Sequence, residues 1–415
     1  MNDERAVDLL LSMVAIQSLS HEEAELARFL VAEMSRLGFD AAVDAAGNAV
    51  GEIGTGPRTI VLAGHMDTVP GDLPVRIEDG KLHGRGSVDA KGPLAAFVAA
   101  AARFGARGPG GMGGLRVVVA GCVQEEVPSS AGARHLAQRA APDLLVVGEP
   151  SGWDGITLGY KGYLRARVAV RGEAKHTAHA PPTTPERGVD AWIAVRAACA
   201  EYNAGRERTF DQLMPALLEV RTESDGVHER CAFELTLRLP LDLGPEAAVA
   251  WLRERAGEGA EVEVLGALPA WAGPRTSELH RALARAILEE GGRPVYKHKT
   301  GTADLNILAP AWGVPALAYG PGDAALDHTP KEHMVLEEYL AAVRVLEGML
   351  AACATGDGAG ARRGSGSLRP QEAPEACTNP GDSGRRGVGI PSELPSVDAL
   401  PPRDRSPAPR FREPK

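Results

Sequence analysis

The sequence contains little cysteine, and this excludes two kinds of site. Its five cysteines are scattered over 415 residues without a Cys-x-x-Cys pair, so neither a disulfide framework nor a thiolate zinc site is expected. No apolar run approaches the roughly 20 residues of a membrane-spanning helix, and the acidic start MNDERAVDLL lacks the basic and apolar regions of a signal peptide. The formal net charge of −10 disfavours nucleic acid and anionic membranes as partners. We therefore expect a cytoplasmic protein that binds neither.

Apolar residues follow two different patterns along the chain. In 1–158 and again in 269–354, short apolar runs alternate with helical stretches, which is typical of a sheet with helices on both faces. In 159–268, the predicted strands alternate apolar and polar residues, and the elements follow the order strand–helix–strand–strand–helix–strand. This pattern indicates an inserted α+β domain. Residues 355–415 are rich in Pro, Gly, Ser and Arg with one aromatic residue, and this composition predicts a disordered tail. The predicted fold class is α/β with an inserted α+β domain.

Histidines and carboxylates stand at the ends of predicted strands or in the loops beside them. These residues are His65, Asp89, Glu125, Glu126, Glu149 and His328. Ligands gather at the carboxyl ends of strands in open α/β sheets, and imidazoles with carboxylates suit two ions of the zinc class. One carboxylate must bridge, because two cations about 3.5–4 Å apart need a shared anion, and Asp89 in its tight loop is the best candidate.

Glu125 and Glu126 are neighbours, and they cannot both bind one metal ion. Successive side chains of an extended chain face opposite ways. One of the two is therefore expected to bind metal, while the other accepts a proton from water. Upstream, Ser20 and Glu23 fit a capping box at the start of a helix predicted over 21–37.

Five motifs together carry a family resemblance. They are HMD at 65–67, GRGSVDAKG at 84–92, QEE at 124–126, GEPS at 148–151 and DHTP at 327–330. In this order they resemble the M20 family of dinuclear zinc aminoacylases, deacylases and carboxypeptidases, and the resemblance covers about residues 1–354. It implies a zinc-hydrolase catalytic domain with a central sheet flanked by helices.

The resemblance also implies a role for each residue of the site. His65 and Glu149 would bind one metal ion, Glu126 and His328 the other, and Asp89 would bridge them. The ions would be two divalent cations per chain, zinc or alternatively cobalt. Asp67 would orient the ring of His65, and Glu125 would be the general base.

The inserted domain at 159–268 corresponds by resemblance to the family's dimerisation (lid) domain, which implies a homodimer. That domain carries a His in a Gly-x-x-x-His pattern, which polarises the scissile carbonyl across the dimer. Gly172 and His176 fit this pattern, and His176 is the favoured residue. The proline that often follows four residues later comes five residues later, at Pro181, and His179 is a competing candidate.

Longer segments narrow the resemblance within the family. GHMDTVPG, GEPSGWDGITLGYKG and KTGTADLNILAP resemble the hydrolases of carrier-protein-dependent lysine biosynthesis. This implies a substrate in which the α-amino group of lysine, or of ornithine, is joined to the γ-carboxyl group of the terminal glutamate of a small acidic carrier protein. The residues expected to contact the substrate lie in or beside the motif loops and are Lys161, Arg275, Thr302 and Asp304.

Three other hypotheses compete with the carrier-protein hydrolase. The nearest is a deacylase of free N-acetyl-ornithine, N-acetyl-lysine or succinyl-diaminopimelate that uses the same metals. A metal-poor binding or regulatory protein on the same fold is disfavoured, because all six expected positions are filled. A dinucleotide-binding protein is disfavoured because no Gly-x-Gly-x-x-Gly follows a strand.

Overall fold

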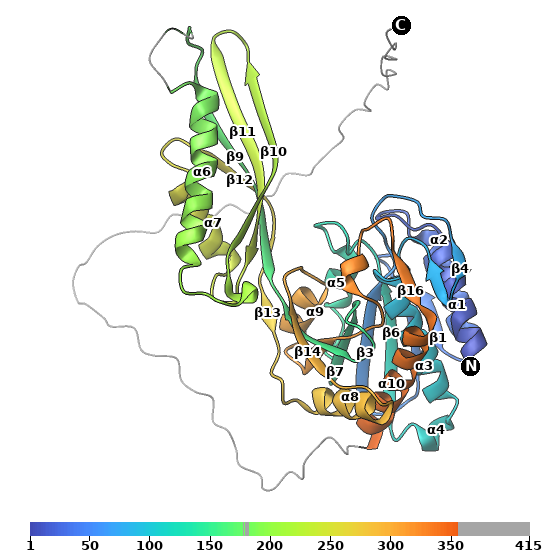
Figure 1. Cartoon of the computed structure of the whole chain (residues 1–415). Coiled ribbons are helices and arrows are strands. Elements are labelled where there is room, and N and C mark those ends of the chain that lie inside the picture. Colours follow the sequence, from blue (N-terminus) through green and yellow to red (C-terminus); the bar gives the residue numbers. More distant parts are fainter. Residues whose placement is uncertain (177, 179–181, 356–415) are drawn as a thin grey trace, which may run out of the picture. The chain divides into compact units, whose positions relative to one another are not determined.

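The computed structural model describes residues 1–355 except 177 and 179–181 (Figure 1). The predicted tail therefore lies outside the described residues, apart from Thr355, which ends the last helix. His179 and Pro181 lie outside them as well. None of the described helices has the length and apolarity to cross a membrane.

The largest sheet contains nine strands. They are β1 (Asp40–Val43), β2 (Ala49–Ile53), β3 (Arg58–His65), β6 (Leu115–Cys122), β7 (Leu144–Gly148), β8 (Gly155–Tyr160), β13 (Trp271–Ala272), β14 (Val295–Lys299) and β15 (Ala316–Ala318). Their order is β1–β2–β6–β3–β7–β15–β8–β13, and β14 pairs with β8. Strands β6, β3, β7 and β15 are parallel neighbours, so their carboxyl ends meet at one edge.

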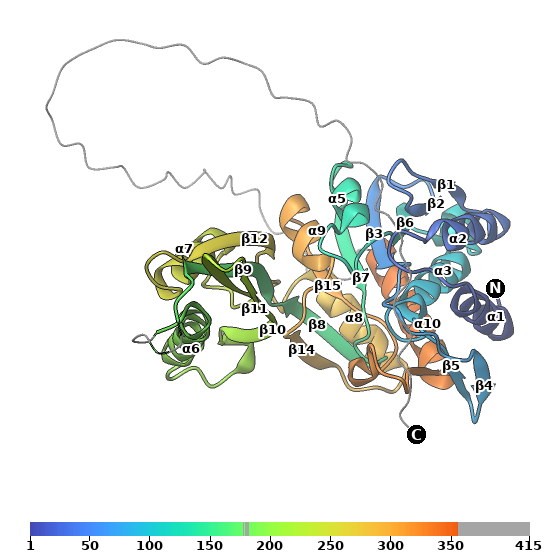
Figure 2. The same cartoon turned by 90° about the horizontal axis from the view of Figure 1, so that it is seen from above.

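Helices cover both faces of this sheet, as the apolar runs predicted (Figure 2). On β3, Ile60 and Leu62 belong to one core and Val61 and Ala63 to another, because successive side chains of a strand face opposite ways. The first core includes residues of α1 (Asp3–Ala15), α2 (Ala24–Arg36), α3 (Lys91–Gly105), α8 (Glu278–Glu289) and α10 (Leu336–Thr355). The second includes α5 (Ala131–Leu136) and α9 (Leu305–Trp312).

Smaller elements complete this part of the chain. A three-stranded antiparallel sheet pairs β5 with a strand on each side. The strands are β4 (Arg76–Glu78), β5 (Lys81–His83) and β16 (His333–Val335), and the short helices are α4 (Gly108–Gly111) and η2 (Ala324–Leu326). The sheet matters for the site because β5 precedes the Asp89 loop and β16 follows the His328 loop.

A second, four-stranded antiparallel sheet has a hydrophobic core of its own. Its elements are β9 (Gly162–Glu173), α6 (Thr184–Tyr202), η1 (Thr209–Asp211), β10 (Met214–Ser224), β11 (His228–Leu239), α7 (Pro245–Arg255) and β12 (Glu261–Leu268). The strand order is β10–β11–β9–β12. Alternate residues of β9, such as Leu164 and Ala166, pack into this core with residues of α6 and α7, while Arg165 and Arg167 are more exposed. The predicted α/β fold class with an additional α+β part is confirmed.

Candidate dinuclear metal centre

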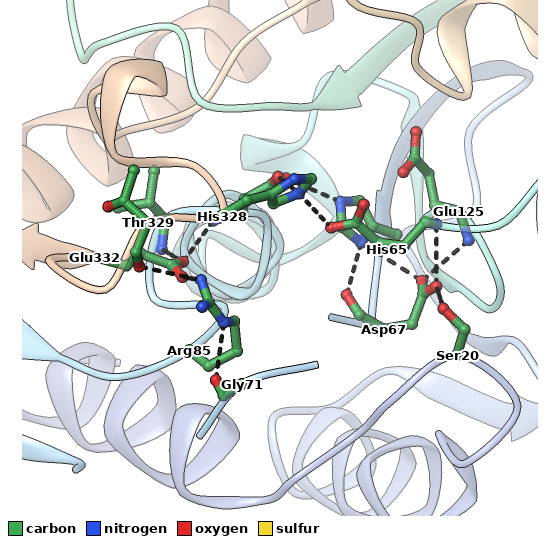
Figure 3. Close-up of polar contacts among 12 residues, drawn as sticks. Ser20, His65, Asp67, Gly71, Arg85, Glu125, His328, Thr329 and Glu332 are labelled. Atoms are coloured by element: carbon green, nitrogen blue, oxygen red, sulfur yellow. Dashed lines mark hydrogen bonds and ion pairs between the residues drawn. The ribbon is translucent and has the colours of Figure 1, made fainter. Parts of the chain in front are cut away.

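Asp89 lies between two histidines. It is in the loop between β5 and α3, and its Oδ1 is 3.2 Å from Nε2 of His65, at the end of β3. Its Oδ2 is 3.0 Å from Nε2 of His328. Figure 3 shows the two imidazoles turned toward the same point. One carboxylate oxygen directed at each imidazole is the arrangement that a bridging ligand requires.

One further carboxylate, that of Glu126, belongs to this cluster, and a second, that of Glu149, lines the cavity beside it. Oε1 of Glu126 is 3.0 Å from Nε2 of His328, and donor atoms of His65, Asp89 and Glu126 all lie within 4.8 Å of one another. Glu149, directly after β7, borders the adjoining cavity, and its burial together with the charge of Asp89 raises the pKa of this carboxyl to about 8. Buried carboxylates crowded in this way need compensating cations. The donor set therefore fits two divalent ions of the zinc class.

Asp67 is fully buried and connects His65 to the two glutamates (Figure 3). The ring nitrogen Nδ1 of His65 is 2.9 Å from the backbone oxygen of Asp67, which leaves Nε2 facing Asp89. The carboxylate of Asp67 accepts hydrogen bonds from the backbone N–H groups of Glu125 at 3.0 Å and Glu126 at 3.1 Å. It therefore holds the backbone of the Glu-Glu pair, and the histidine is oriented by the backbone oxygen of the same residue.

Ser20 belongs to this network, and the sequence prediction for it is wrong. Its hydroxyl donates to Oδ2 of Asp67 at 2.8 Å. Helix α2 begins at Ala24 without a side-chain cap. Glu23 instead accepts a hydrogen bond from the backbone N–H of Gln124 at 3.0 Å. The side chains of Ser20 and Glu23 therefore bind Asp67 and the backbone of Gln124 instead of capping the helix.

Glu125 borders the cavity next to the cluster. Burial and the nearby charge of Glu149 raise the pKa of Glu125 well above its ordinary value, although His65 opposes the shift. A carboxylate whose pKa is raised toward neutrality can both accept and release a proton near pH 7. This property and its position match the role of a general base.

Arg85 and Glu332 form a clamp that the sequence did not reveal (Figure 3). The buried carboxylate of Glu332 accepts hydrogen bonds from the backbone N–H groups of Val88 at 3.0 Å and Asp89 at 3.2 Å. Arg85 donates to Glu332 at 2.7 Å and to the backbone oxygen of Thr329 at 3.3 Å. These bonds tie together the two loops that carry Asp89 and the second histidine. The partners are distant in sequence, so no local pattern could have predicted the contact.

A cavity of about 770 Å³ opens beside the cluster. Besides the glutamates, its wall includes cationic side chains from the second sheet, Arg165 and Arg238, and Lys299 from β14. Thr302, one of the residues expected to contact substrate, lies on the same wall, and its hydroxyl accepts a hydrogen bond from Arg238 at 2.9 Å. The cavity therefore combines the carboxylate cluster with a cationic side.

Lys161, also expected to contact substrate, is instead fully buried. Its ammonium group donates to the backbone oxygens of Thr209 at 3.2 Å, Phe210 at 3.0 Å and Gln212. Burial lowers the pKa of Lys161 to about 8. An ammonium group has three hydrogens, and here all three are directed at η1 and the residue that follows it. The structure therefore gives Lys161 a structural role between β8 and β9.

The structure does not bring Arg275 and Asp304 to the cavity wall described above. The guanidinium of Arg275 lies over the ring of Tyr296, 3.9 Å from its centroid. Asp304 is buried at the start of α9, where burial raises its pKa to about 7. Of the four residues expected to contact substrate, Thr302 alone borders this cavity among the described residues.

His176 lies three residues beyond Glu173, the last residue of β9. Its Nδ1 accepts a hydrogen bond from the backbone N–H of Ala178 at 3.1 Å. Tyr163, near the start of β9, borders the cavity. A strand rises about 3.3 Å per residue, so the ten residue steps from Tyr163 to Glu173 span roughly 33 Å. His176 is therefore far from the cavity of its own chain.

Comparisons with known proteins agree with the motifs. The sequence profile of Peptidase family M20/M25/M40 matches residues 61–352. A LysW-lysine hydrolase from Deinococcus radiodurans is 46% identical over 352 residues, covering 84% of this chain and 96% of the relative.

Two solved structures share the fold. An M20-family metallo-carboxypeptidase from Sulfolobus solfataricus superposes with a TM-score of 0.70 at 17% identity, covering 85% of this chain and all of the other. A dinuclear metal-binding peptidase from Bacillus subtilis gives 0.64 at 14% identity, covering 85% and 98%. The resemblance deduced from the five motifs is confirmed. The chain belongs to peptidase family M20/M25/M40 and is a hydrolase that acts on amide bonds.

Proposed function

We propose that this enzyme releases lysine from a small carrier protein by hydrolysing the amide between the lysine α-amino group and the γ-carboxyl group of the carrier's terminal glutamate. The observation that carries the chemistry is Asp89 between two histidines, with Glu125 at the same cavity. The substrate is supported by 46% identity with the LysW-lysine hydrolase of D. radiodurans over nearly its whole length. Ornithine, one methylene shorter, is a second amino acid that the same site is proposed to release.

Two divalent cations are part of this proposal, with zinc favoured and cobalt as the alternative. The proposed ligands are His65 and Glu149 for one ion, Glu126 and His328 for the other, and Asp89 between them. Imidazole and carboxylate donors without thiolate suit these metals. When bound, such ions polarise a carbonyl group and lower the pKa of a water molecule.

The protein's own side chains carry the proton and set the geometry. Glu125 takes a proton from the attacking water and delivers it to the nitrogen of the leaving amino acid. Asp67 supports this step because its carboxylate holds the backbone of Glu125. The same residue fixes the orientation of His65, so one buried aspartate aligns the base with a metal ligand.

The cationic wall of the cavity suits the anionic groups of the proposed substrate. The lysine α-carboxylate and the α-carboxylate of the terminal glutamate both lie close to the scissile amide. Arg238 and Lys299, on the wall, are proposed to bind them, since charge-assisted hydrogen bonds to carboxylates are among the stronger polar contacts. Lys161 is not included, because its hydrogens are directed at backbone oxygens.

A homodimer formed through the region 159–268 completes the proposal. Strand β10 is at the outer edge of its sheet and exposes Leu218 and Val220, while α6 exposes Val189 and Ile193. An exposed apolar edge strand favours pairing with a second chain. His176, too far from its own cavity, would then polarise the scissile carbonyl in the partner's site.

We further propose a cytoplasmic location. Cys122, Cys199, Cys231 and Cys353 are all buried and free. Structural disulfides are rare where thiols are kept reduced, and unpaired cysteines suit that compartment.

One assay tests the function directly. Purified, metal-replete protein is incubated with lysyl carrier protein, ornithyl carrier protein, N-acetyl-lysine, N-acetyl-ornithine and succinyl-diaminopimelate, and the released amino acid is quantified. We expect kcat/KM for a carrier substrate to exceed that for every free substrate by at least about 100-fold, which is a difference of about 2.7 kcal/mol in transition-state stabilisation. Faster turnover of a free acylated amino acid would instead favour the hypothesis that the enzyme is a deacylase of small molecules.

A further inference from the structure

The proposed substrate carries one cationic group near the scissile bond, the ε-ammonium of lysine. Enclosing that charge in a cavity is costly unless an anion pairs with it. The carboxylates on the described wall of the cavity are Asp89, Glu125, Glu126, Glu149 and Asp327. The first four have proposed roles in metal binding and proton transfer. Asp327 has none.

One oxygen of the Asp327 carboxylate lacks a hydrogen-bond donor among the described residues. Asp327 follows η2 and borders the cavity. Its Oδ1 is shielded from solvent and has no hydrogen-bond partner among the described residues. A buried polar atom left without a partner costs free energy, and such atoms are rare in native structures. An ammonium group, with three donor hydrogens and a positive charge, would satisfy it.

The position of Asp327 also suits the length of lysine. It directly precedes His328, a proposed metal ligand, with adjacent Cα atoms about 3.8 Å apart, and both residues border the same cavity. The amide nitrogen to be released is attached to the lysine Cα, and a flexible four-carbon stem separates that atom from the ammonium group. This stem can extend from the reaction centre to a neighbouring residue.

We propose that Asp327 forms the subsite for the terminal ammonium group of the leaving amino acid and thereby selects a diamino acid. The inference rests on the proposed function, because it assumes that an amino acid leaves from the scissile amide. It adds a specificity-determining residue that acts on the leaving side chain and not on the chemical step.

The test compares a charged side chain with a neutral one of similar length. Carrier protein linked to lysine and carrier protein linked to norleucine are assayed with the wild type and with Asp327→Asn. Asp323→Asn is the control, because Asp323 lies on the same loop outside the described cavity wall, and asparagine keeps the oxygen that caps Ala325. Bound metal is measured for each protein, since Asp327 neighbours a proposed ligand.

We expect Asp327→Asn to lower kcat/KM for the lysyl substrate by about 10- to 100-fold, the range for a hydrogen bond to a charged group. The norleucyl reaction should change less than about threefold, and Asp323→Asn should alter neither by more. Equal losses on both substrates, or no loss on the lysyl substrate, would overturn the subsite. If the metal-replete wild type hydrolyses neither carrier substrate, the proposed function fails, and the subsite fails with it.

A second variant decides the matter if Asp327→Asn fails to fold or loses metal. Asp327→Glu keeps the charge and moves it one methylene further into the cavity. It should raise the ratio of ornithyl to lysyl turnover by about tenfold, because one methylene is worth roughly 10- to 200-fold in discrimination. An unchanged ratio would contradict the subsite.

Discussion

Replacing Glu332 by glutamine should weaken both the fold and the metal site. Glutamine has the same shape and keeps an oxygen for the backbone N–H groups of Val88 and Asp89, but it loses the charge that faces Arg85. That ion pair is 2.7 Å long, with Glu332 fully buried and the Arg85 side chain 14% exposed. Breaking a buried pair typically costs about 3–5 kcal/mol. Because glutamine retains part of the hydrogen bonding, we expect a loss of about 2–4 kcal/mol in the free energy of unfolding.

The same substitution should also lower the affinity for metal, because Glu332 holds the backbone N–H of Asp89, a proposed metal ligand. Loss of a partner that orients a ligand typically costs about 10- to 100-fold in metal affinity. Both effects are measurable without turnover. Urea unfolding of the metal-free protein gives the stability, and titration with cobalt, followed by its absorption spectrum, gives the affinity and reports distortion of the site.

Glu78→Gln is the matched control for this experiment. Arg76 and Glu78 form a 3.1 Å ion pair on β4, in the sheet whose strands β5 and β16 adjoin the two clamped loops, with side chains 49% and 60% exposed. Exposed pairs contribute about 0–1 kcal/mol, so this variant should stay within about 0.5 kcal/mol of the wild type and bind cobalt normally. If Glu332→Gln unfolds and binds cobalt as the control does, the clamp does not position Asp89.

The remaining predictions concern the metals, the dimer and one buried histidine. Chelation should abolish turnover, and added zinc or cobalt should restore it; active protein with only trace divalent metal would refute the dinuclear centre. Mixing inactive His176→Ala chains with inactive His65→Ala chains should restore about a quarter of the sites, because half of randomly mixed two-fold dimers are mixed and each rebuilds one site; no recovery in proven mixed dimers would exclude action across the dimer. Burial lowers the pKa of His280 to about 4, against about 6.5 when unfolded. As the pH falls, the unfolded chain therefore binds the proton before the folded chain does. The contribution of His280 to the free energy of unfolding is present above pH 6.5 and is lost toward pH 4. The loss between pH 7 and pH 5 should be about 1–2 kcal/mol. His280→Gln should remove this part of the pH dependence of urea unfolding, and an unchanged slope would contradict it.

The sequence predicted the parts of the site that depend on local pattern. Apolar runs marked β3, β6 and β7, and the residues after them were expected at one sheet edge. The structure brings His65, Glu126 and Glu149 there, because parallel neighbouring strands end together. The strand–helix order also predicted the second sheet with its own core.

Local pattern could not predict what long-range packing does to a polar side chain. Lys161 lies in a motif loop, yet the chain 48–51 residues later encloses its ammonium group with backbone oxygens. Ser20 has the spacing of a helix cap, but Asp67, 47 residues away, accepts its hydroxyl hydrogen. Arg85 and Glu332 are 247 residues apart. In each case the partner is set by the fold, and no nearby residue indicates it.

In the proposed reaction, Glu125 moves the proton at a metal site that other residues hold. Glu125→Gln keeps the shape of the side chain and removes its basic oxygen, and no ligand is changed. The decisive measurement is kcat of this variant on lysyl carrier protein together with its metal content. We expect two divalent ions per chain, as in the wild type, and a kcat lower by about 100-fold or more. Near-normal turnover in the metal-replete variant would show that Glu125 is not the general base.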